Sequence, residues 1–243
     1  GMSLIYLIPG ISSNSLMGNL NFANILGGNS NSSNSTSTQR TSLAFDSLFP
    51  GDNFFKFENE TTTEGYSYDL IKFFDAIIFT EIETSFTVDE INALKRYLTL
   101  GGRIFVFCDN RTDNIIENTN DLLTLGGLSF NSTKTGIITL NTTNDLPSAL
   151  NTNISQLVLD SPLTLNATSD VLEQNLTQLL NPYMAIAEIG AGKLIAIGDG
   201  DVLKEFSLFN AQTKISNQQN KIFITNLINS SLDERFDINI TLS

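Results

Sequence analysis

The chain has 243 residues, of which 41% are hydrophobic, and its 26 acidic and 13 basic residues give a formal net charge of −13. An acidic chain with few, scattered basic residues is not expected to bind nucleic acid or an anionic membrane surface. No apolar run approaches the roughly 18 residues of a membrane-spanning helix, so we expect no membrane span in this chain. The length and hydrophobic content fit one large domain with a sizeable core.

Two residue types limit the chemistry that this chain can perform. Histidine is absent, and cysteine occurs once, at Cys108. A single cysteine cannot form an internal disulfide. Without histidine, the chain has no histidine metal ligand, no histidine general base, and no Ser–His or Cys–His nucleophile pair. Enzymes that depend on such groups are therefore excluded.

Asparagine, serine and threonine are unusually frequent, with 28, 24 and 25 copies. If they were placed independently, about six Asn-x-Ser/Thr acceptor motifs would be expected. The sequence contains 11, beginning at Asn31, Asn34, Asn59, Asn110, Asn131, Asn141, Asn153, Asn166, Asn175, Asn229 and Asn239. One interpretation is codon bias in an asparagine-rich genome. The other is a glycosylated protein that is secreted or exposed at the cell surface.

The first elements alternate strands with polar segments. Residues 4–8 form a short apolar run that ends at Pro9-Gly10 and predicts a strand. Residues 12–41 are rich in Ser, Asn, Gly and Thr and predict a mobile loop, with an ordered glycan-bearing or ligand-covering loop as the alternative. Further along, the pattern predicts a helix over 42–48, a strand over 54–57 and a short helix over 68–74. The opening Gly1-Met2-Ser3 is typical of a cleavage scar, so we expect that a signal peptide or anchor has been removed.

The stretch from Asp75 to Asn110 predicts one complete strand, helix and strand unit, around which the rest of the chain is arranged. Residues 76–79 and 104–108 are unbroken apolar runs, typical of strands that are buried on both faces. The helix between them begins with a capping box of Thr87 and Glu90 and ends at two glycines. We therefore expect two parallel strands joined by a right-handed crossover.

After this unit the pattern predicts a second crossover helix over 113–125. Short strands follow over 136–140, 156–159 and 163–166, and then a hairpin whose arms are 183–189 and 193–197. The last predicted elements are a helix over 219–232 and a polar, β-prone tail over 236–243.

Together these elements predict a single α/β domain over residues 1–243, with a three-layer, flavodoxin-like arrangement. We expect a mostly parallel sheet of about five or six strands with helices on both faces. The strands that contain Leu4, Ala76, Ile104 and Lys193 should lie side by side. Residues 128–197 should form an antiparallel extension of this sheet.

Four segments in this order, DAIIFTE, TVDEINALKRYLTLGG, GRIFVFCDN and GAGKLIAIGDGDVL, resemble class I glutamine amidotransferase-like domains. More narrowly, these segments are similar to the non-catalytic members found in uncharacterised surface proteins and in auxiliary subunits of ABC transporters. The resemblance extends from about Leu4 to Leu232 and implies a flavodoxin-like sheet. It also implies a recognition or scaffold function without catalysis.

The resemblance does not include the catalytic residues. Active members carry a cysteine in a Gly-x-Cys-x-Gly elbow, served by a downstream histidine and an acid. Cys108 stands at the corresponding strand end, but Val106 and Asn110 replace the two glycines, and no histidine exists to form the thiolate. Cys108 is therefore interpreted as a vestigial nucleophile position, and amidotransferase activity is not expected.

Acidic residues follow several predicted strands, at the edge where open parallel sheets bind ligands. The candidates are Glu81, Asp109, Asp199 and Asp201, and Glu83 follows two residues after the first of them. Converging carboxylates could bind Ca²⁺ or Mg²⁺, or could supply an acid and a base to a glycoside. The other interpretation is that these acids cap turns locally.

The sequence thus leaves two functional hypotheses. The first is a non-catalytic recognition or scaffold domain of an extracellular or transporter-associated protein, with a protein or carbohydrate partner and no cofactor. The second is a carbohydrate-active or cation-dependent binding protein or hydrolase that uses the acidic strand ends.

Overall fold

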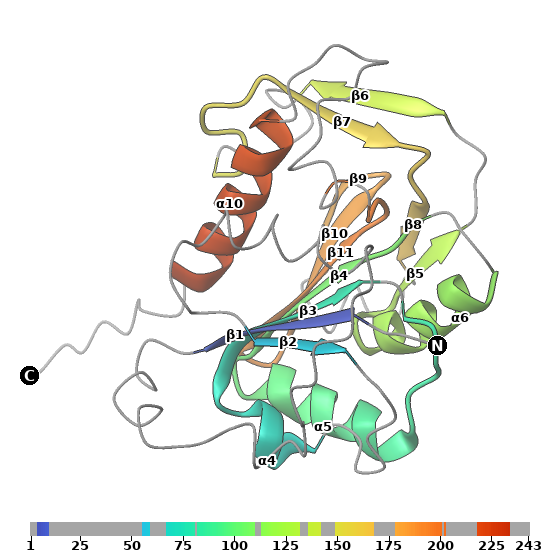
Figure 1. Cartoon of the computed structure of the whole chain (residues 1–243), viewed down its shortest axis with the longest axis vertical. Helices are drawn as coiled ribbons and strands as arrows, with labels where there is room; N and C mark the ends of the chain where they lie inside the picture. The colour runs from blue at the N-terminus through green and yellow to red at the C-terminus, as the bar shows by residue number, and fades with distance from the viewer. Residues whose placement is uncertain are drawn as a thin grey trace, which may run out of the picture.

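The protein is an α/β protein with a mixed sheet, as shown by a computed structural model that describes residues 4–9, 55–58, 67–80, 82–109, 113–131, 136–141, 149–167, 178–200, 202 and 218–233 (Figure 1). The loop predicted over 12–41, the helix predicted over 42–48 and the tail predicted over 236–243 lie outside these residues.

The main sheet has seven strands in the order β2-β1-β3-β4-β11-β10-β9. Their bounds are Leu4–Pro9 for β1, Phe55–Glu58 for β2, Phe74–Thr80 for β3, Arg103–Phe107 for β4, Gln178–Asn181 for β9, Met184–Ile189 for β10 and Gly192–Ile197 for β11. The prediction that the strands of Leu4, Ala76, Ile104 and Lys193 are neighbours is confirmed, because β1, β3, β4 and β11 are consecutive in the sheet.

Strand direction differs in part from the prediction. β3 runs parallel to β4, and β4 runs parallel to β11, as expected. The other four pairings, β1–β2, β1–β3, β10–β11 and β9–β10, are antiparallel. The prediction of a mostly parallel sheet is therefore wrong. An unbroken apolar run indicates only that a strand is covered on both faces, and antiparallel strands in the middle of a covered sheet show the same pattern.

Helix α5 (Val88–Thr99) joins β3 to β4 and has both predicted ends. The Thr87 hydroxyl accepts a hydrogen bond from the Glu90 amide at 3.3 Å, and the Thr87 amide donates to the Glu90 carboxylate at 2.7 Å. After the helix, Gly101 has a φ of +102°, which a residue with a side chain rarely adopts. The Tyr97 hydroxyl donates to the Phe74 carbonyl at 3.0 Å and so fixes the helix to the start of β3.

The two faces of the sheet carry separate hydrophobic cores. In β3, Ile77 and Phe79 face the first core, whereas Ala76 and Ile78 face the second, as the alternation of side chains in a strand requires. Helices α4 (Tyr68–Ile71), α5 and α6 (Asp113–Leu123) cover the first core. Helix α10 (Gln218–Asp233) covers the second (Figure 1). The prediction of helices on both faces is confirmed.

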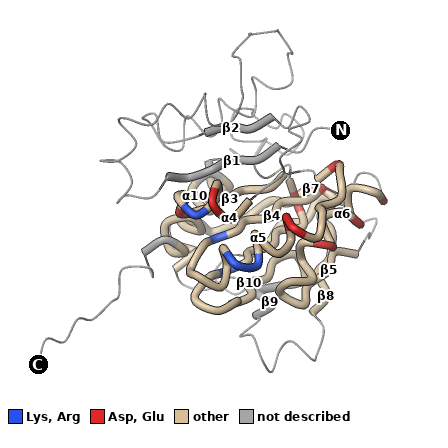
Figure 2. The backbone as a smooth tube through the Cα atoms, turned by 90° about the horizontal axis from the view of Figure 1, so that it is seen from below, with Lys and Arg blue, Asp and Glu red and all other residues tan. Residues whose placement is uncertain are grey.

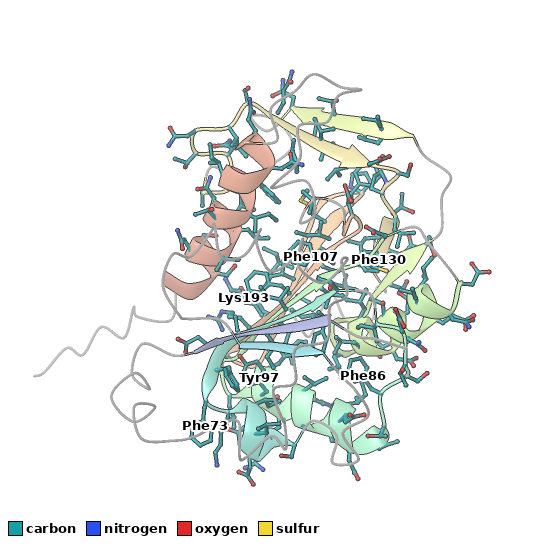
Figure 3. All side chains as sticks on the ribbon, in the orientation of Figure 1. Phe73, Phe86, Tyr97, Phe107, Phe130 and Lys193 are labelled. Atoms are coloured by element: carbon teal, nitrogen blue, oxygen red, sulfur yellow. The ribbon has the colours of Figure 1, made fainter. Side chains whose placement is uncertain are left out.

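Side chains show the same division. Tyr97 belongs to the first core and Phe107 to the second, and Figure 3 places them on opposite sides of the sheet. Phe86 extends the first core, because its ring packs edge-to-face on the Phe79 ring with 5.5 Å between the centroids.

Residues 128–197 depart from a simple extension of the sheet. β5 (Leu128–Asn131) pairs with β8 (Thr164–Ala167), and β6 (Ile137–Asn141) pairs with β7 (Gln156–Asp160), as two separate antiparallel ribbons. Of the strands described in this range, only β9 and β10 extend the main sheet in antiparallel fashion, and β11 lies within it, parallel to β4. Helix α6 leads through a 3₁₀ turn (Thr124–Gly126) into β5, so the prediction of a second crossover helix is wrong.

Amide side chains hold these ribbons against the helices. The Asn120 side chain on α6 both accepts from the Phe130 amide at 2.7 Å and donates to the Phe130 carbonyl at 3.1 Å. The Asn220 side chain on α10 makes the same pair of bonds with Val158, at 3.3 and 2.9 Å. An asparagine amide has one donor and one acceptor group, so it can pair with strand backbone as another strand would.

Candidate functional site

The carboxyl ends of β4 and β11 lie side by side, and each is followed by an acidic residue. The Cys108 amide donates to the Ile197 carbonyl at 3.1 Å, which continues the parallel pairing to the last residue before Asp109. Asp199 occupies the corresponding end of β11. The structure therefore brings Asp109 and Asp199 to one edge of the sheet, as predicted. Glu81 and Asp201, the other two candidates, lie outside the described residues.

Asp199 uses both carboxylate oxygens within the fold. One oxygen accepts a hydrogen bond from the Asp160 amide at 2.9 Å, and the other accepts from the Val202 amide at 3.2 Å. The side chain is only 1% exposed. Asp199 thus ties the end of β7 to the end of β11 and caps the turn that follows. This is the local capping role that short acidic side chains often take.

The connection from β7 to β8 lies across the carboxyl end of β11 and pairs with its backbone. The Leu163 amide donates to the Gly198 carbonyl at 2.6 Å, and the Gly198 amide donates to the Tyr183 carbonyl at 2.9 Å. The backbone groups at this strand end are therefore paired with protein, in the place where an open parallel sheet would meet a ligand.

Asp109 is also buried, with 7% of its surface exposed. Its carboxylate lies against the backbone of Gly200, where an added Cβ would be 2.6 Å from one carboxylate oxygen. A side chain at position 200 would require the Asp109 carboxylate to shift. In the described part of the Asp199-Gly200-Asp201 segment, Gly200 makes room for Asp109. Sequence reasoning missed this role, because the sequence does not show that Gly200 packs against the Asp109 carboxylate.

These contacts define what the site can do. Asp109 and Asp199 are two buried carboxylates held by their own fold, and Glu83 is exposed after β3. Among the described residues, no group of three or more acidic or cysteine side chains is arranged to hold a metal ion. Binding of Ca²⁺ or Mg²⁺ with the help of Glu81 and Asp201 stays a prediction.

Cys108 is buried at the end of β4, within the first core. Its side chain has no measurable exposure, and its sulfur lies 3.7 Å from the Asp109 carbonyl oxygen, to which the thiol donates. A nucleophilic thiol must be accessible and must ionise, and burial in apolar surroundings opposes both. The location therefore fits a core residue.

We expect iodoacetamide to alkylate Cys108 at neutral pH at least about a hundredfold more slowly in the folded protein than in the urea-unfolded chain, because labelling requires exposure of the thiol. Mass spectrometry of timed samples measures both rates. The unfolded chain provides the control for the intrinsic reactivity of the thiol. Equal or faster labelling of the folded protein would restore Cys108 as a nucleophile.

Comparison with known proteins adds information on the fold. No protein-family model matches the chain, and no curated protein matches it. Among solved structures, the mmIFT52 N-terminal domain is similar with a TM-score of 0.51 and 17% identity, over 68% of this chain and 80% of that domain. A cytoplasmic protein from Salmonella typhimurium LT2 is similar with a TM-score of 0.50 and 11% identity, over 74% of this chain and 92% of that protein.

A putative ThuA-like protein from Bacteroides uniformis ATCC 8492 gives a TM-score of 0.48 at 16% identity, over 78% of this chain and 82% of that protein. At such identities a similarity concerns architecture and carries no activity from one protein to another. The first two similarities agree with the α/β fold described above. Function has to be argued from the residues of this chain.

Proposed function

We propose that this chain is a non-catalytic recognition or scaffold domain of an extracellular or transporter-associated protein. The observation that carries this proposal is the use of the strand-end acids by the fold itself. Both Asp199 oxygens accept backbone amides, and the Asp109 carboxylate is buried against Gly200. Carboxylates committed in this way would have to give up these contacts to bind a ligand.

The missing catalytic groups support the same proposal. The chain has no histidine, and Cys108, at the position of the amidotransferase nucleophile, is buried. A flavodoxin-like origin, related to class I glutamine amidotransferases, is part of the proposal. Its support is the β3-α5-β4 unit with β11 parallel beside it.

We propose that the partner is a protein or a carbohydrate bound at the surface. Figure 2 shows acidic residues along α6 and basic residues on α5, whose first turn is acidic and whose last turn contains Arg96. With the net charge of −13, this distribution supports the exclusion of nucleic acid. Among the described helices, none combines the length and the hydropathy of a membrane-spanning segment.

Thermal unfolding with Ca²⁺, Mg²⁺ and a panel of sugars tests whether the strand ends bind a ligand. We expect no rise in the melting temperature that depends on the strand-end carboxylates, since these are already used within the fold. A real site at one hundred times its Kd would stabilise the protein by about 2.7 kcal/mol, which is readily measured.

Two variants that remove the same charge make this test specific. Asp109→Asn alters the buried site, whereas Glu83→Gln alters an exposed carboxylate in the segment that follows the neighbouring strand β3. A stabilisation by one ligand that is lost in Asp109→Asn and kept in Glu83→Gln would refute the proposal. It would favour the cation-dependent or carbohydrate-active alternative.

A further inference from the structure

The asparagines of this protein fall into two groups that differ in exposure. The structure describes the exposure of five that begin an acceptor motif, and all five are exposed: Asn131, Asn141, Asn153, Asn166 and Asn229. It describes the exposure of seven outside such motifs: Asn92, Asn114, Asn118, Asn120, Asn151, Asn220 and Asn226. Of these seven, only Asn92 and Asn114 are exposed. Codon bias would place asparagine without regard to the motif, so it does not account for this division.

The inward-facing group has a structural use. Asn120 and Asn220 pair with the backbone of β5 and β7, as described above. Asn226 donates to the Leu150 carbonyl at 3.2 Å, and Asn118 donates to the Ile82 carbonyl at 3.2 Å. These four side chains are committed to the fold, and none of them begins an acceptor motif. The side chains that do begin one point outward, where a bulky glycan has room.

We propose that Asn131, Asn141, Asn153, Asn166 and Asn229 are sites of N-glycosylation. This inference rests on the proposed extracellular placement. The donor class is an oligosaccharide linked to a lipid through phosphate. The asparagine Nδ2 forms a bond to the anomeric carbon of the first sugar, and the bond from that carbon to the phosphate oxygen breaks. Nδ2 loses one proton, and the lipid phosphate is the leaving group.

The five sites are distributed over the ribbons and the last helix. Asn131 and Asn166 lie on the paired strands β5 and β8, Asn141 ends β6, and Asn229 lies on α10 (Figure 1). Asn153 precedes β7 with a φ of +62°. Residues 67–109, which include α4 and α5, contain no acceptor motif. The glycans would therefore leave the α4 and α5 side of the described protein uncovered.

One site fixes the order of modification and folding. The acceptor motif of Asn229 includes Ser231, whose hydroxyl donates to the Leu227 carbonyl at 2.7 Å and whose surface is only 4% exposed. The motif is recognised through this third residue as well as through the asparagine. Sugar transfer to Asn229 must therefore precede the packing of α10.

Peptide mapping by mass spectrometry of protein purified from its native host tests the inference. We expect a glycan mass on peptides of all five asparagines. Asn92 and Asn114 are the internal controls, because they are exposed but lie outside any acceptor motif. Thr168→Val should abolish the modification of Asn166 alone, and Thr168→Ser should retain it, since serine preserves the motif.

A second measurement separates this inference from the proposed function. An amine reagent that cannot cross membranes is applied to intact cells, and labelling of the exposed Lys95 is compared with that after lysis. Labelled Lys95 with modification at fewer than three of the five asparagines overturns the glycosylation inference and leaves the extracellular proposal standing. If Lys95 is labelled only after lysis and the asparagines are unmodified, both the glycosylation inference and the extracellular proposal are overturned. Equal modification of Asn92 or Asn114 would also refute the inference.

Discussion

Replacing Phe223 by alanine is expected to lower the free energy of unfolding by about 3–5 kcal/mol. Phe223 lies on α10 and is completely buried against the second core. Its removal loses the transfer free energy of a large ring and leaves a cavity that the sheet cannot fill, because the strands are held by their neighbours. Urea unfolding followed by far-UV circular dichroism measures the change.

Phe73→Ala is the matched control, because this phenylalanine is 46% exposed after α4. It should cost less than about 1 kcal/mol, as surface substitutions generally do. If Phe223→Ala does not fold, Phe223→Leu removes fewer atoms and keeps the comparison measurable. Equal losses at the two phenylalanine positions would show that α10 does not cover the second face of the sheet.

Replacing Arg103 by methionine is expected to cost about 3 kcal/mol, since each buried carbonyl left without a donor costs roughly 1–3 kcal/mol and such losses are not additive. Arg103 begins β4 and is 3% exposed. Its guanidinium donates to the carbonyls of Ser231 at 2.8 Å, Gly101 at 2.7 Å and Ala191 at 3.1 Å. It thus joins the last turn of α10 to two turns at the edge of the sheet.

The charge also suits this position, because the carbonyl end of a helix carries partial negative charge. Arg103→Lys keeps the charge but lacks the planar fork that reaches several carbonyls, so we expect it to recover only part of the loss.

Arg96→Met is the control at an exposed arginine, which lies 4.2 Å from the centre of the Tyr68 ring and should contribute about 0.5–1 kcal/mol. A cost for Arg103→Met no larger than for Arg96→Met would contradict this account. Both are measured by urea unfolding.

The elements that could be predicted from the sequence are those fixed by local patterns. The capping box of Thr87 and Glu90 and the glycines after α5 gave this helix its ends within one residue. The direction of β1 could not be predicted in the same way, because its partners β2 and β3 are distant in the sequence, whereas the antiparallel β10–β11 hairpin was predicted from its glycine turn. The hydrogen bonds of Asn120 and Asn220 to strand backbone could not be predicted either, because they follow no periodic pattern in the sequence.

The candidate site shows the same limit. The position of Asp109 and Asp199 at one edge followed from parallel strands and was predicted. Their roles were not, because they depend on the Asp160 amide and on Gly200, which reach the site only through the tertiary fold. A carboxylate after a strand has the same appearance in the sequence whether it binds a cation or caps a turn.

The position of α10 along the chain determines how the protein is completed during synthesis. The first core draws its residues from Ile71 to Ala196, whereas the second needs Phe223 to Ile228. Chains emerge from the ribosome at roughly 5–20 residues per second, amino end first. The first core can therefore close while the opposite face of the sheet still exposes Phe105 and Phe107 to solvent. A chain that stops before residue 218 lacks α10 and keeps part of this apolar face uncovered, and chaperones and proteases can recognise it as unfinished.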